Sequence, residues 1–477
     1  MDLLNIIKDD VERRYFKGLL SQIDSEGNDL SIHTDKHPSG LYPTAIAPKE
    51  LFDELPYSDY ESLRNMYKVN GKLNATLWLK KMHGGVGSSI ERSTYLKSHG
   101  REQLGAKGTD LFIKTSNGEI SIAKAQIIQA LKKLERFERI VYQDIINEDV
   151  QEIFEEIWKD PELSNIERFP SLVQTNLPTL DSKGELTLER VAPAGHGLFG
   201  YEIIESIFDD TRRPQGNNII LCIGNGEDLS STPDRTVTNW MLQEKIPICM
   251  VTTTKTQSDM KGGQISLKKS ENGKTFLTII EKAQAEKSNQ LELFEQLGLR
   301  ENDKHAFFNT NLVLVNIDVL KTMLIDKDKD EILAVSLPNL IRNTKEQHNK
   351  SYTQLEGALG SVFLNLDAYW RETFDQPLVH ILNIPVKFRT RFFSPIKTAF
   401  DYFMQYHSDR FSFNEKTYHL KNNNHKYQPL VSLPNVYKDI SVVLEDFKNC
   451  SIVNLKSLKL KKRTSLAGKE LSGDITI

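Results

Sequence analysis

The chain has 477 residues, of which 39% are hydrophobic and 26% are charged, and its formal net charge is -4. This composition is that of an ordinary globular protein, and the length predicts a large domain with at least one smaller appendage. The small net charge argues against a protein whose whole surface binds nucleic acid or an anionic membrane.

Cysteine usage and hydropathy indicate where the protein works. Cys222, Cys249 and Cys450 are an odd number without paired spacing, which favours a reducing compartment. The first residues, MDLLNIIKDDVERRYF, lack an apolar segment of signal-peptide length, and no run approaches the roughly 20 apolar residues of a membrane helix. We therefore expect a cytoplasmic protein with no nucleic-acid or membrane partner.

The apolar pattern predicts three regions. Residues 1–70 are expected to form an N-terminal helical arm, because Val11, Tyr15, Leu19 and Ile23 recur at helical spacing. Residues 71–425 alternate short apolar runs with longer amphipathic stretches, as in an α/β domain. Residues 426–477 carry short apolar pairs between polar turns, which predicts a small all-β, β-helix-like domain and a candidate surface for homo-oligomer formation.

Within the middle region, three strands and one helix stand out. Strands are expected at 75–79 (ATLWL), 219–223 (IILCI) and 307–317 (FFNTNLVLVNI), and an amphipathic helix from Ile120 to Arg139. Since open α/β sheets present ligands at the carboxyl ends of their strands, the segments that follow the strands are candidate sites.

Two glycine-rich turns could bring the backbone against a ligand. The first follows a strand and reads Met82-His83-Gly84-Gly85-Val86-Gly87-Ser88-Ser89. Glycines of this kind can turn successive N–H groups toward phosphate oxygens, although many tight turns share the pattern and it is not a P-loop. The second, Pro193-Ala194-Gly195-His196-Gly197, precedes a helical run and could place an imidazole at a helix N-terminus.

Carboxylates and lysines supply the remaining candidates. Asn225-Gly226-Glu227-Asp228 ends a buried strand, and hard oxygen donors there suit Mg²⁺, with a capped turn as the alternative. Lys261 and Lys397 each lie beside turn-forming residues and could neutralise phosphate charge, although most lysines are merely solvated.

The order of these segments over most of residues 75–405 resembles the UDP-glucose pyrophosphorylase family of UTP-dependent sugar nucleotidyltransferases. The family's Leu-Asn-Gly-Gly-Leu-Gly-Thr is similar to 82–88, its Pro-Gly-His-Gly to 194–197 and its Asn-x-Asp-Asn-Leu to 225–229. Its later segments match Asp259-Met260-Lys261-Gly262-Gly263, Phe308-Asn309-Thr310-Asn311, Gln354-Leu355-Glu356-Gly357-Ala358-Leu359-Gly360 and Pro395-Ile396-Lys397-Thr398-Ala399-Phe400-Asp401.

The resemblance implies a Rossmann-like mixed central sheet of the glycosyltransferase-A-like nucleotidyltransferase class, and a reaction in which UTP and glucose 1-phosphate give UDP-glucose and pyrophosphate. It implies four groups of site residues. They are Met82, His83, Gly84, Gly85, Gln174 and Gly195 for the nucleotide; His196, Asn225, Gly226, Glu356 and Asn311 for the sugar phosphate; Glu227 and Asp228 for Mg²⁺; and Lys397 and Lys107 for catalysis.

Three departures from the family pattern leave alternatives open. His83 replaces an asparagine, Glu227 replaces the metal-binding aspartate, so that Asp228 could be the ligand instead, and the loop lysine could be Lys107 or Lys97. The segment Gln174-Thr175-Asn176-Leu177-Pro178 looks like that of UDP-N-acetylhexosamine and broad UDP-sugar pyrophosphorylases. A catalytically weak sugar-nucleotide-binding regulator is a further alternative.

Overall fold

The computed structural model of the chain describes residues 3–23, 41–85, 87, 89–256, 259, 262–269, 273–287, 289–297, 305–347, 350–426 and 428–477. Four residues of the sequence motifs, Val86, Ser88, Met260 and Lys261, lie outside this part of the chain. Among the described residues, no helix is long and apolar enough to cross a membrane.

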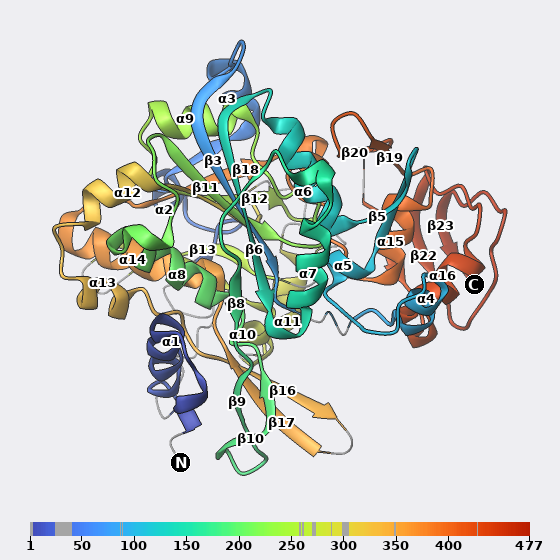
Figure 1. Cartoon of the computed structure of the whole chain (residues 1–477), viewed down its shortest axis with the longest axis horizontal. Helices are drawn as coiled ribbons and strands as arrows, with labels where there is room; N and C mark the ends of the chain where they lie inside the picture. The colour runs from blue at the N-terminus through green and yellow to red at the C-terminus, as the bar shows by residue number, and fades with distance from the viewer. Residues whose placement is uncertain are drawn as a thin grey trace.

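A large mixed sheet forms the centre of the molecule (Figure 1), which confirms the predicted fold class. Its main path runs in the order β2-β18-β12-β15-β11-β3-β6-β7. These strands are β2 (Tyr57–Asp59), β18 (Val379–Ile384), β12 (Ile248–Thr254), β15 (Phe307–Asn316), β11 (Ile219–Asn225), β3 (Leu73–His83), β6 (Phe137–Asn147) and β7 (Glu167–Arg168). Four more strands join the sheet off this path: β1 (Leu41–Pro43), β8 (Leu172–Gln174), β13 (Gln264–Lys269) and β14 (Thr275–Ile280).

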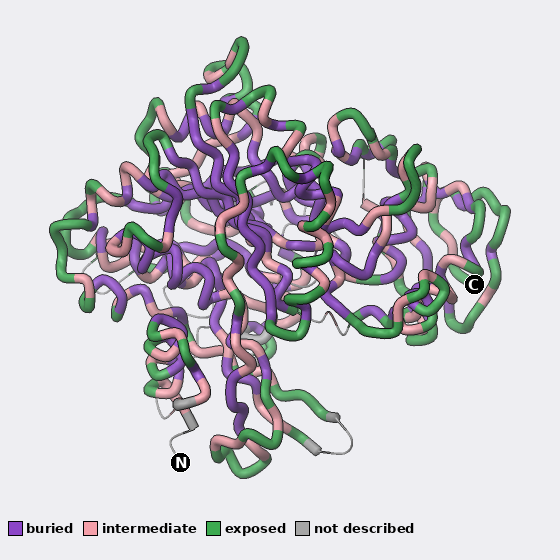
Figure 2. The backbone as a smooth tube through the Cα atoms, viewed as in Figure 1, coloured by how far each residue is buried: buried purple, intermediate pink, exposed green. Residues whose placement is uncertain are grey.

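Both faces of the sheet are buried, which explains why its central strands are nearly continuous apolar runs. Along β11, Ile220 and Cys222 face one core, whereas Leu221 and Ile223 face the other. The first core contains residues of α6 (Ile122–Lys133), α9 (Arg235–Gln243) and α15 (Ala399–Tyr406), and the second those of α1 (Asp10–Leu20), α8 (Gly197–Phe208), α12 (Ile317–Leu324), α13 (Lys329–Val335) and α14 (Leu359–Phe374). Figure 2 shows this buried centre beneath an exposed periphery.

A second, four-stranded sheet projects from the base of the domain (Figure 1). It consists of β10 (Leu186–Ala192), β9 (Leu177–Leu180), β17 (Lys350–Glu356) and β16 (Ile341–Gln347), in that order. The remaining helices and hairpin strands are α2 (Lys49–Asp53), α3 (Tyr60–Met66), α4 (Ser93–Ser98), α5 (Lys107–Asp110), α7 (Gln151–Trp158), α10 (Lys282–Lys287), α11 (Leu291–Gln296), β4 (Phe112–Thr115), β5 (Gly118–Ser121), β19 (Phe411–Asn414) and β20 (His419–Asn422).

The two ends of the chain differ from the sequence expectations. The expected N-terminal arm contains α1, but β1 and β2 of the same region pair with strands of the central sheet. The C-terminal region has three parallel strands, β21 (Leu430–Ser432), β22 (Leu455–Lys459) and β23 (Gly473–Thr476). It is not all-β, because α16 (Ile440–Asp446), capped by Asp439, buries Ile440 and Val443 against the first core. The β-helix-like description and the three domain boundaries remain predictions.

The predicted helix over 120–139 is shorter in the structure. It corresponds to α6, since the chain turns after Lys133 and Phe137 already begins β6.

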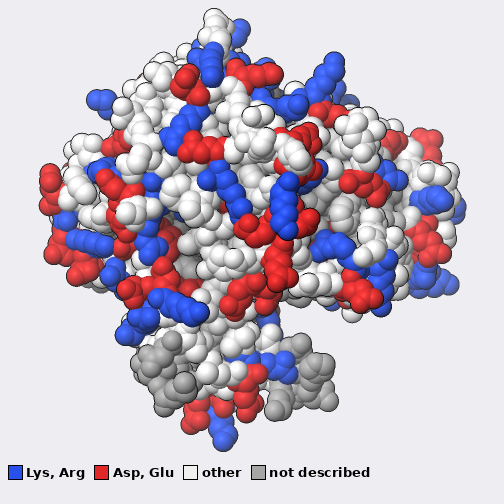
Figure 3. All heavy atoms as spheres, viewed as in Figure 1, with Lys and Arg blue, Asp and Glu red and all other residues white. Residues whose placement is uncertain are grey.

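Acidic and basic side chains are interspersed over the face of the molecule shown in Figure 3, in keeping with the small net charge.

Candidate active site

The carboxyl ends of neighbouring parallel strands converge at one edge of the sheet. Asn225 at the end of β11 is opposite Met82 of β3, His83 is opposite Ile146 of β6, and Gln174 at the end of β8 is opposite Asn147 of β6. Residues that are distant in sequence therefore meet where an open α/β sheet binds ligands.

A cavity of about 140 Å³ opens at this edge. Its lining comes from the glycine-rich turn, α5 and the segment after β11: Met82, His83, Gly85, Gly87, Ala106, Lys107, Gly108, Gly226 and Glu227. Seven of these nine are among the predicted site residues or belong to the same glycine turn, so the structure brings the first and third sequence motifs together.

Close backbone packing shapes the floor of the cavity. The Gly226 N–H donates to the carbonyl of Met82 over 2.9 Å, which fixes the turn after β11 against β3. A Cβ atom on Gly226 would lie 2.3 Å from Nδ1 of His83, and one on Gly108 would lie 2.6 Å from the Gly226 carbonyl oxygen. Only glycine fits at both positions.

His83 lines the cavity, but its ring is packed as part of the interior. The imidazole is buried and lies 4.7 Å from the ring of Phe154, and within the described part of the chain neither ring nitrogen has a hydrogen-bond partner. Burial, together with the charge of Lys81, lowers the pKa of His83 to about 3. A direct contact between this ring and the nucleotide remains a prediction.

Lys107 lies inside the cavity and Lys97 does not line it. The Lys107 ammonium donates to the Ile396 carbonyl over 2.9 Å and is 3.8 Å from Oε1 of Glu227. Lys97, on α4, is exposed. The structure thus joins the glycine loop to the segment that carries Lys397 through Lys107.

Glu227 and Asp228, the two candidate metal ligands, occupy different environments. The side chain of Glu227 is 23% exposed and lines the cavity. Asp228 is fully buried, and its carboxylate accepts hydrogen bonds from the backbone N–H groups of Ser230 (2.8 Å) and Ser394 (3.0 and 3.1 Å). Burial raises the pKa of Asp228 to about 7. Asp228 therefore connects the turn after β11 to the segment before Lys397, and Glu227 is the carboxylate of the two that lines the cavity.

The residues predicted to read the base lie together at the end of β8. The Gln174 side chain is buried and donates from Nε2 to the Gly195 carbonyl over 3.4 Å. A Cβ atom on Gly84 would approach Oε1 of Gln174 to 3.0 Å. Gly195 has a left-handed φ of 77°, and a Cβ there would lie 2.7 Å from Glu356.

His196 has a defined tautomer. Its Nδ1 accepts a hydrogen bond of 2.7 Å from the backbone N–H of Leu359, so the proton of the neutral ring is on Nε2. Burial lowers the pKa of His196 to about 4. Nearby, Glu356 accepts from Nδ2 of Asn343 over 3.0 Å, and burial raises its pKa. An N–H donor and a carboxyl group are thus available for a sugar phosphate.

A bulge in β15 determines the backbone conformation of Asn311. Leu312 is opposite Val251 of β12 and Asn309 is opposite Thr252, so Thr310 and Asn311 form a bulge. Asn311 takes a left-handed φ of 58°, and its Oδ1 accepts from Nδ2 of Asn309 over 2.8 Å. The sequence motif located this residue but not its unusual backbone.

Lys397 is held between two aromatic rings. Its ammonium is 5.1 Å from the ring centre of Phe308 and 5.7 Å from that of Phe393. Burial lowers the pKa of Lys397, although the charge of Asp259 opposes the shift. Burial also raises the pKa of Glu281 to about 7, and the charge of Lys397 counteracts that rise.

The sequence did not identify Arg389 as part of this site. Arg389 forms a bidentate ion pair with Asp259, with N–O distances of 2.6 and 2.7 Å. Both side chains are buried. The pKa of Asp259 is lowered: burial alone would raise it, and the Arg389 charge outweighs that effect. Asp259 belongs to a recognised motif, but nothing in the sequence links it to an arginine 130 residues away.

A divalent cation fits the donor chemistry of the cavity. Among the described residues, no cluster of three or more His, Cys, Asp and Glu side chains could hold a metal without help. Mg²⁺ in nucleotide enzymes needs only one or two carboxylates, because substrate phosphates and waters complete its shell. Glu227 supplies one such carboxylate beside Lys107.

Comparisons with known proteins give one consistent family. The family model described as UTP--glucose-1-phosphate uridylyltransferase matches residues 147–467. The enzyme of that name from Solanum tuberosum is 27% identical over 66% of this chain, and the match spans only 59% of its own length. The Pyrus pyrifolia enzyme is 26% identical over 85% of this chain and 78% of its own length.

Solved structures agree on the fold. The UDP-glucose pyrophosphorylase from Leishmania major, determined in open and closed forms, matches with a TM-score of 0.71 and 20% identity, covering 99% of this chain and 93% of that chain. Because the family model spans more than half of the sequence, the chain belongs to the UTP--glucose-1-phosphate uridylyltransferase family.

Proposed function

We propose that this chain transfers the uridylyl group of UTP to glucose 1-phosphate, giving UDP-glucose and pyrophosphate. The observation that carries the proposal is the meeting of four elements at one edge of the sheet: the glycine turn, Lys107, Glu227 and the segment before Lys397. Family membership agrees with this activity.

The proposed reaction is an in-line displacement at the α-phosphorus of UTP. A phosphate oxygen of the sugar 1-phosphate forms the new P–O bond, and the bond to pyrophosphate breaks with its electron pair. The nucleophile is already an anion, so the protein has no proton to remove. Its task is to position the two substrates and to neutralise charge.

Two lysines are assigned to neutralise that charge. Lys107 reaches the cavity from α5 and is assigned to the leaving pyrophosphate, while Lys397 is assigned to the attacking sugar phosphate. Because Lys397 is buried between Phe308 and Phe393, its charge is less screened than that of an exposed lysine.

Base and sugar recognition use neutral donors and acceptors. Gln174 and Gly195 are assigned to the uracil edge, where the glycine turn packs beside them. His196, with its Nε2 proton, donates to the sugar phosphate, and Asn225, Asn311 and Glu356 are assigned to the same substrate. An N–H donor favours a phosphate acceptor without needing an imidazolium charge.

Mg²⁺ is the proposed cofactor, and Glu227 would hold it. When bound, the ion would supply positive charge that neutralises part of the charge on the phosphates. The longer arm of glutamate compared with aspartate still offers a hard oxygen donor. We further propose that the protein works in the cytoplasm, since its three cysteines are free and buried, and that the C-terminal region forms any contact between copies.

A pyrophosphate-release assay tests the activity. Purified protein is incubated with Mg²⁺ and UTP or ATP, and with glucose 1-phosphate or N-acetylglucosamine 1-phosphate. We expect turnover with UTP and glucose 1-phosphate, and a rate with ATP lower by about tenfold or more, because a buried amide left unpaired costs about 1–3 kcal/mol. Lys397→Ala should lower kcat by several orders of magnitude with an unchanged melting temperature.

Three outcomes would contradict the proposal. Equal rates with UTP and ATP would exclude uridylyl specificity. Faster turnover of N-acetylglucosamine 1-phosphate would move the chain to the N-acetylhexosamine class. Tight binding of UDP-glucose without turnover would identify a regulatory sugar-nucleotide-binding protein.

A further inference from the structure

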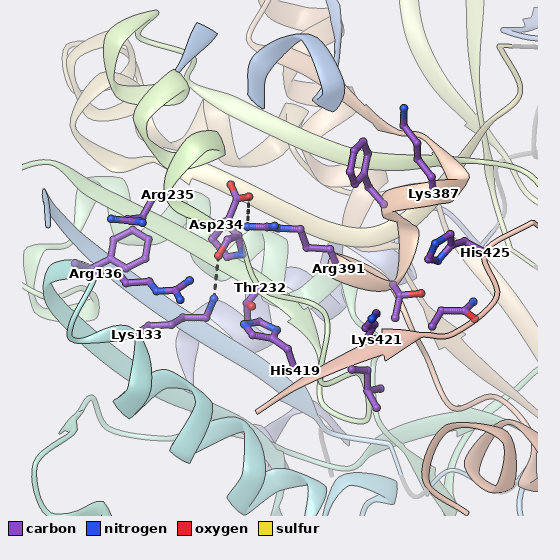
Figure 4. A pocket seen from close by; sticks show the side chains of 16 residues that line it. Lys133, Arg136, Thr232, Asp234, Arg235, Lys387, Arg391, His419, Lys421 and His425 are labelled. Carbon is purple, nitrogen blue, oxygen red and sulfur yellow. Dashed lines mark hydrogen bonds and ion pairs between the residues drawn. The ribbon is translucent and has the colours of Figure 1, made fainter. Parts of the chain in front are cut away.

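A second cavity, larger than the first, lies between α6, the start of α9, the 3-10 helix Val386–Arg391 and β20 (Figure 4). Its volume is about 320 Å³. It includes Arg136 and Phe137, where β6 begins, whereas the candidate active site lies where β6 ends. None of the residues that line it belongs to the catalytic cavity.

The lining of this second cavity is strongly basic. Six of the described residues that line it are lysine or arginine, namely Lys133, Arg136, Arg235, Lys387, Arg391 and Lys421, and only Asp234 is acidic. Figure 4 shows Lys133, Arg136 and Arg391 turning their charged ends toward the same space beside His419.

Asp234, the acidic residue of this lining, already interacts with three other residues. The Asp234 carboxylate accepts from the backbone of Val237, from the hydroxyl of Tyr60 and from Arg391, the last over 2.7 Å. Lys387 pairs with Glu61 outside the cavity. Among the described residues, the other four basic side chains have no carboxylate within 4.0 Å.

Within the described part of the chain, none of these four side chains forms an ion pair with a carboxylate, although Asp234 attracts the Lys133 charge from a longer distance. Lys133 donates to the Pro233 carbonyl over 3.1 Å and Arg235 to the carbonyl of Gly71, both neutral acceptors. Lys133 is 92% buried, since its exposed fraction is 8%, and burial lowers its pKa to about 7. Like charges at this density repel one another unless an anion lies between them.

We propose that this cavity is a binding site for a small molecule that carries several phosphate groups, separate from the catalytic site. Lysine and arginine are the side chains that recognise phosphate, and arginine can bind two oxygens at once. The volume admits a ligand of sugar-bisphosphate or short polyphosphate size, but no folded macromolecule. The rim residues Arg136 and Lys421 are exposed, so an anion can enter from solvent.

The site is connected to the catalytic edge by two continuous segments. Gln126, Gln129 and Lys133 lie along one face of α6 and donate to the carbonyls of Asp228, Leu229 and Pro233. These three carbonyls belong to the segment 227–234, which begins with Glu227 of the catalytic cavity and ends at Asp234 of the basic cavity. Likewise, Arg391 faces the basic cavity, while Arg389 of the same 3-10 helix binds Asp259.

Calorimetric titration tests the proposal. The probes are inorganic tripolyphosphate and a hexose bisphosphate, each titrated with EDTA present to prevent turnover and with saturating UDP-glucose to occupy the catalytic site. We expect binding of at least one probe, weakened by salt because the contacts are ionic. Tighter binding of tripolyphosphate would identify inorganic polyphosphate as the source, and tighter binding of the bisphosphate an organic phosphate.

A matched pair of double variants locates the binding. Arg136→Glu with Lys421→Glu reverses two charges on the rim, and Lys132→Glu with Lys416→Glu makes the same change in net charge at exposed residues outside the cavity. We expect the first pair to weaken binding more than about tenfold and the control pair to change it less than about threefold. Equal losses in both, undiminished binding in the first, or binding of neither probe to the unchanged protein would overturn the proposal.

Discussion

The backbone N–H of Leu359 donates to Nδ1 of His196 over 2.7 Å, which assigns the ring proton to Nε2. Burial lowers the pKa of His196 to about 4, so the ring is neutral at pH 7 and gains a second proton only as the pH falls toward 4. Nitrogen NMR of histidine-labelled protein should show an unprotonated Nδ1 from pH 6 to 8, with His196→Gln providing the assignment. A ring that titrates near pH 6.5 would contradict this geometry.

Glu227 and Asp228 should respond differently to loss of charge. Glu227→Gln is expected to abolish Mg²⁺-dependent turnover without changing the melting temperature, because Glu227 faces the cavity. Asp228→Asn should lower the melting temperature and affect turnover less, since its amide cannot accept from Ser230 and both contacts to Ser394 as a carboxylate does. Glu227→Asp should retain part of the activity. Full activity of Glu227→Gln at low Mg²⁺ would reassign the metal ligand.

Lys107 and Lys97 form a natural pair of test and control. Lys107→Met should lower kcat by about 100-fold or more, because the charge that we propose neutralises the leaving pyrophosphate is lost. Lys97→Met, at an exposed position of α4, should leave kcat within about twofold, as expected for a lysine on the surface. Steady-state kinetics in both directions of the reaction measures the difference. A larger loss in Lys97→Met would make Lys97 the loop lysine.

Removal of one partner of the Asp259–Arg389 ion pair should lower the stability of the protein. Arg389→Met leaves the Asp259 carboxylate buried without its partner, and we expect the free energy of unfolding to fall by about 3–5 kcal/mol. Asp259→Asn in the same chain should recover part of that loss. Urea denaturation of the two single variants and the double variant gives the coupling. Independent, additive losses would show that the two side chains do not stabilise each other.

His83 should make stability depend on pH. Its pKa is about 3 in the folded protein and near 6.5 in the unfolded chain, so the unfolded chain binds the proton first as the pH falls. The contribution of His83 to the free energy of unfolding is fully present above pH 6.5. It falls by about 1.4 kcal/mol for each pH unit as the pH decreases toward 3. His83→Asn should therefore flatten the decline in the free energy of unfolding between pH 6.5 and 4.5.

His425→Asn provides a control for that measurement, because His425 is an exposed residue, whereas His83 is buried. The free energy of unfolding of His425→Asn should decline with falling pH as steeply as that of the unchanged protein. An equal decline in His83→Asn would show that the His83 ring is hydrated in the folded protein.

The sequence alone determined the order of the motifs and the strands that carry them. Apolar runs at 75–79, 219–223 and 307–317 predicted the middle of β3, most of β11 and the whole of β15, because strands buried on both faces need such runs. Family resemblance assigned roles to Gln174, His196 and Lys397 from local patterns, and these roles stay predictions. The C-terminal helix α16 was missed, since its short apolar pairs do not distinguish a helix from strands.

Only the tertiary structure decided which residues share an environment. The sequence favoured Lys107 and left Lys97 as an alternative, whereas packing puts Lys107 beside Glu227 and leaves Lys97 in solvent. Glu227 and Asp228 are adjacent carboxylates, and the fold leaves Glu227 partly exposed while it buries Asp228 against Ser394. The pairing of Asp259 with Arg389 and the second, basic cavity join segments that are far apart along the chain. Burial and long-range contact set these properties, and both arise only when the chain has folded back on itself.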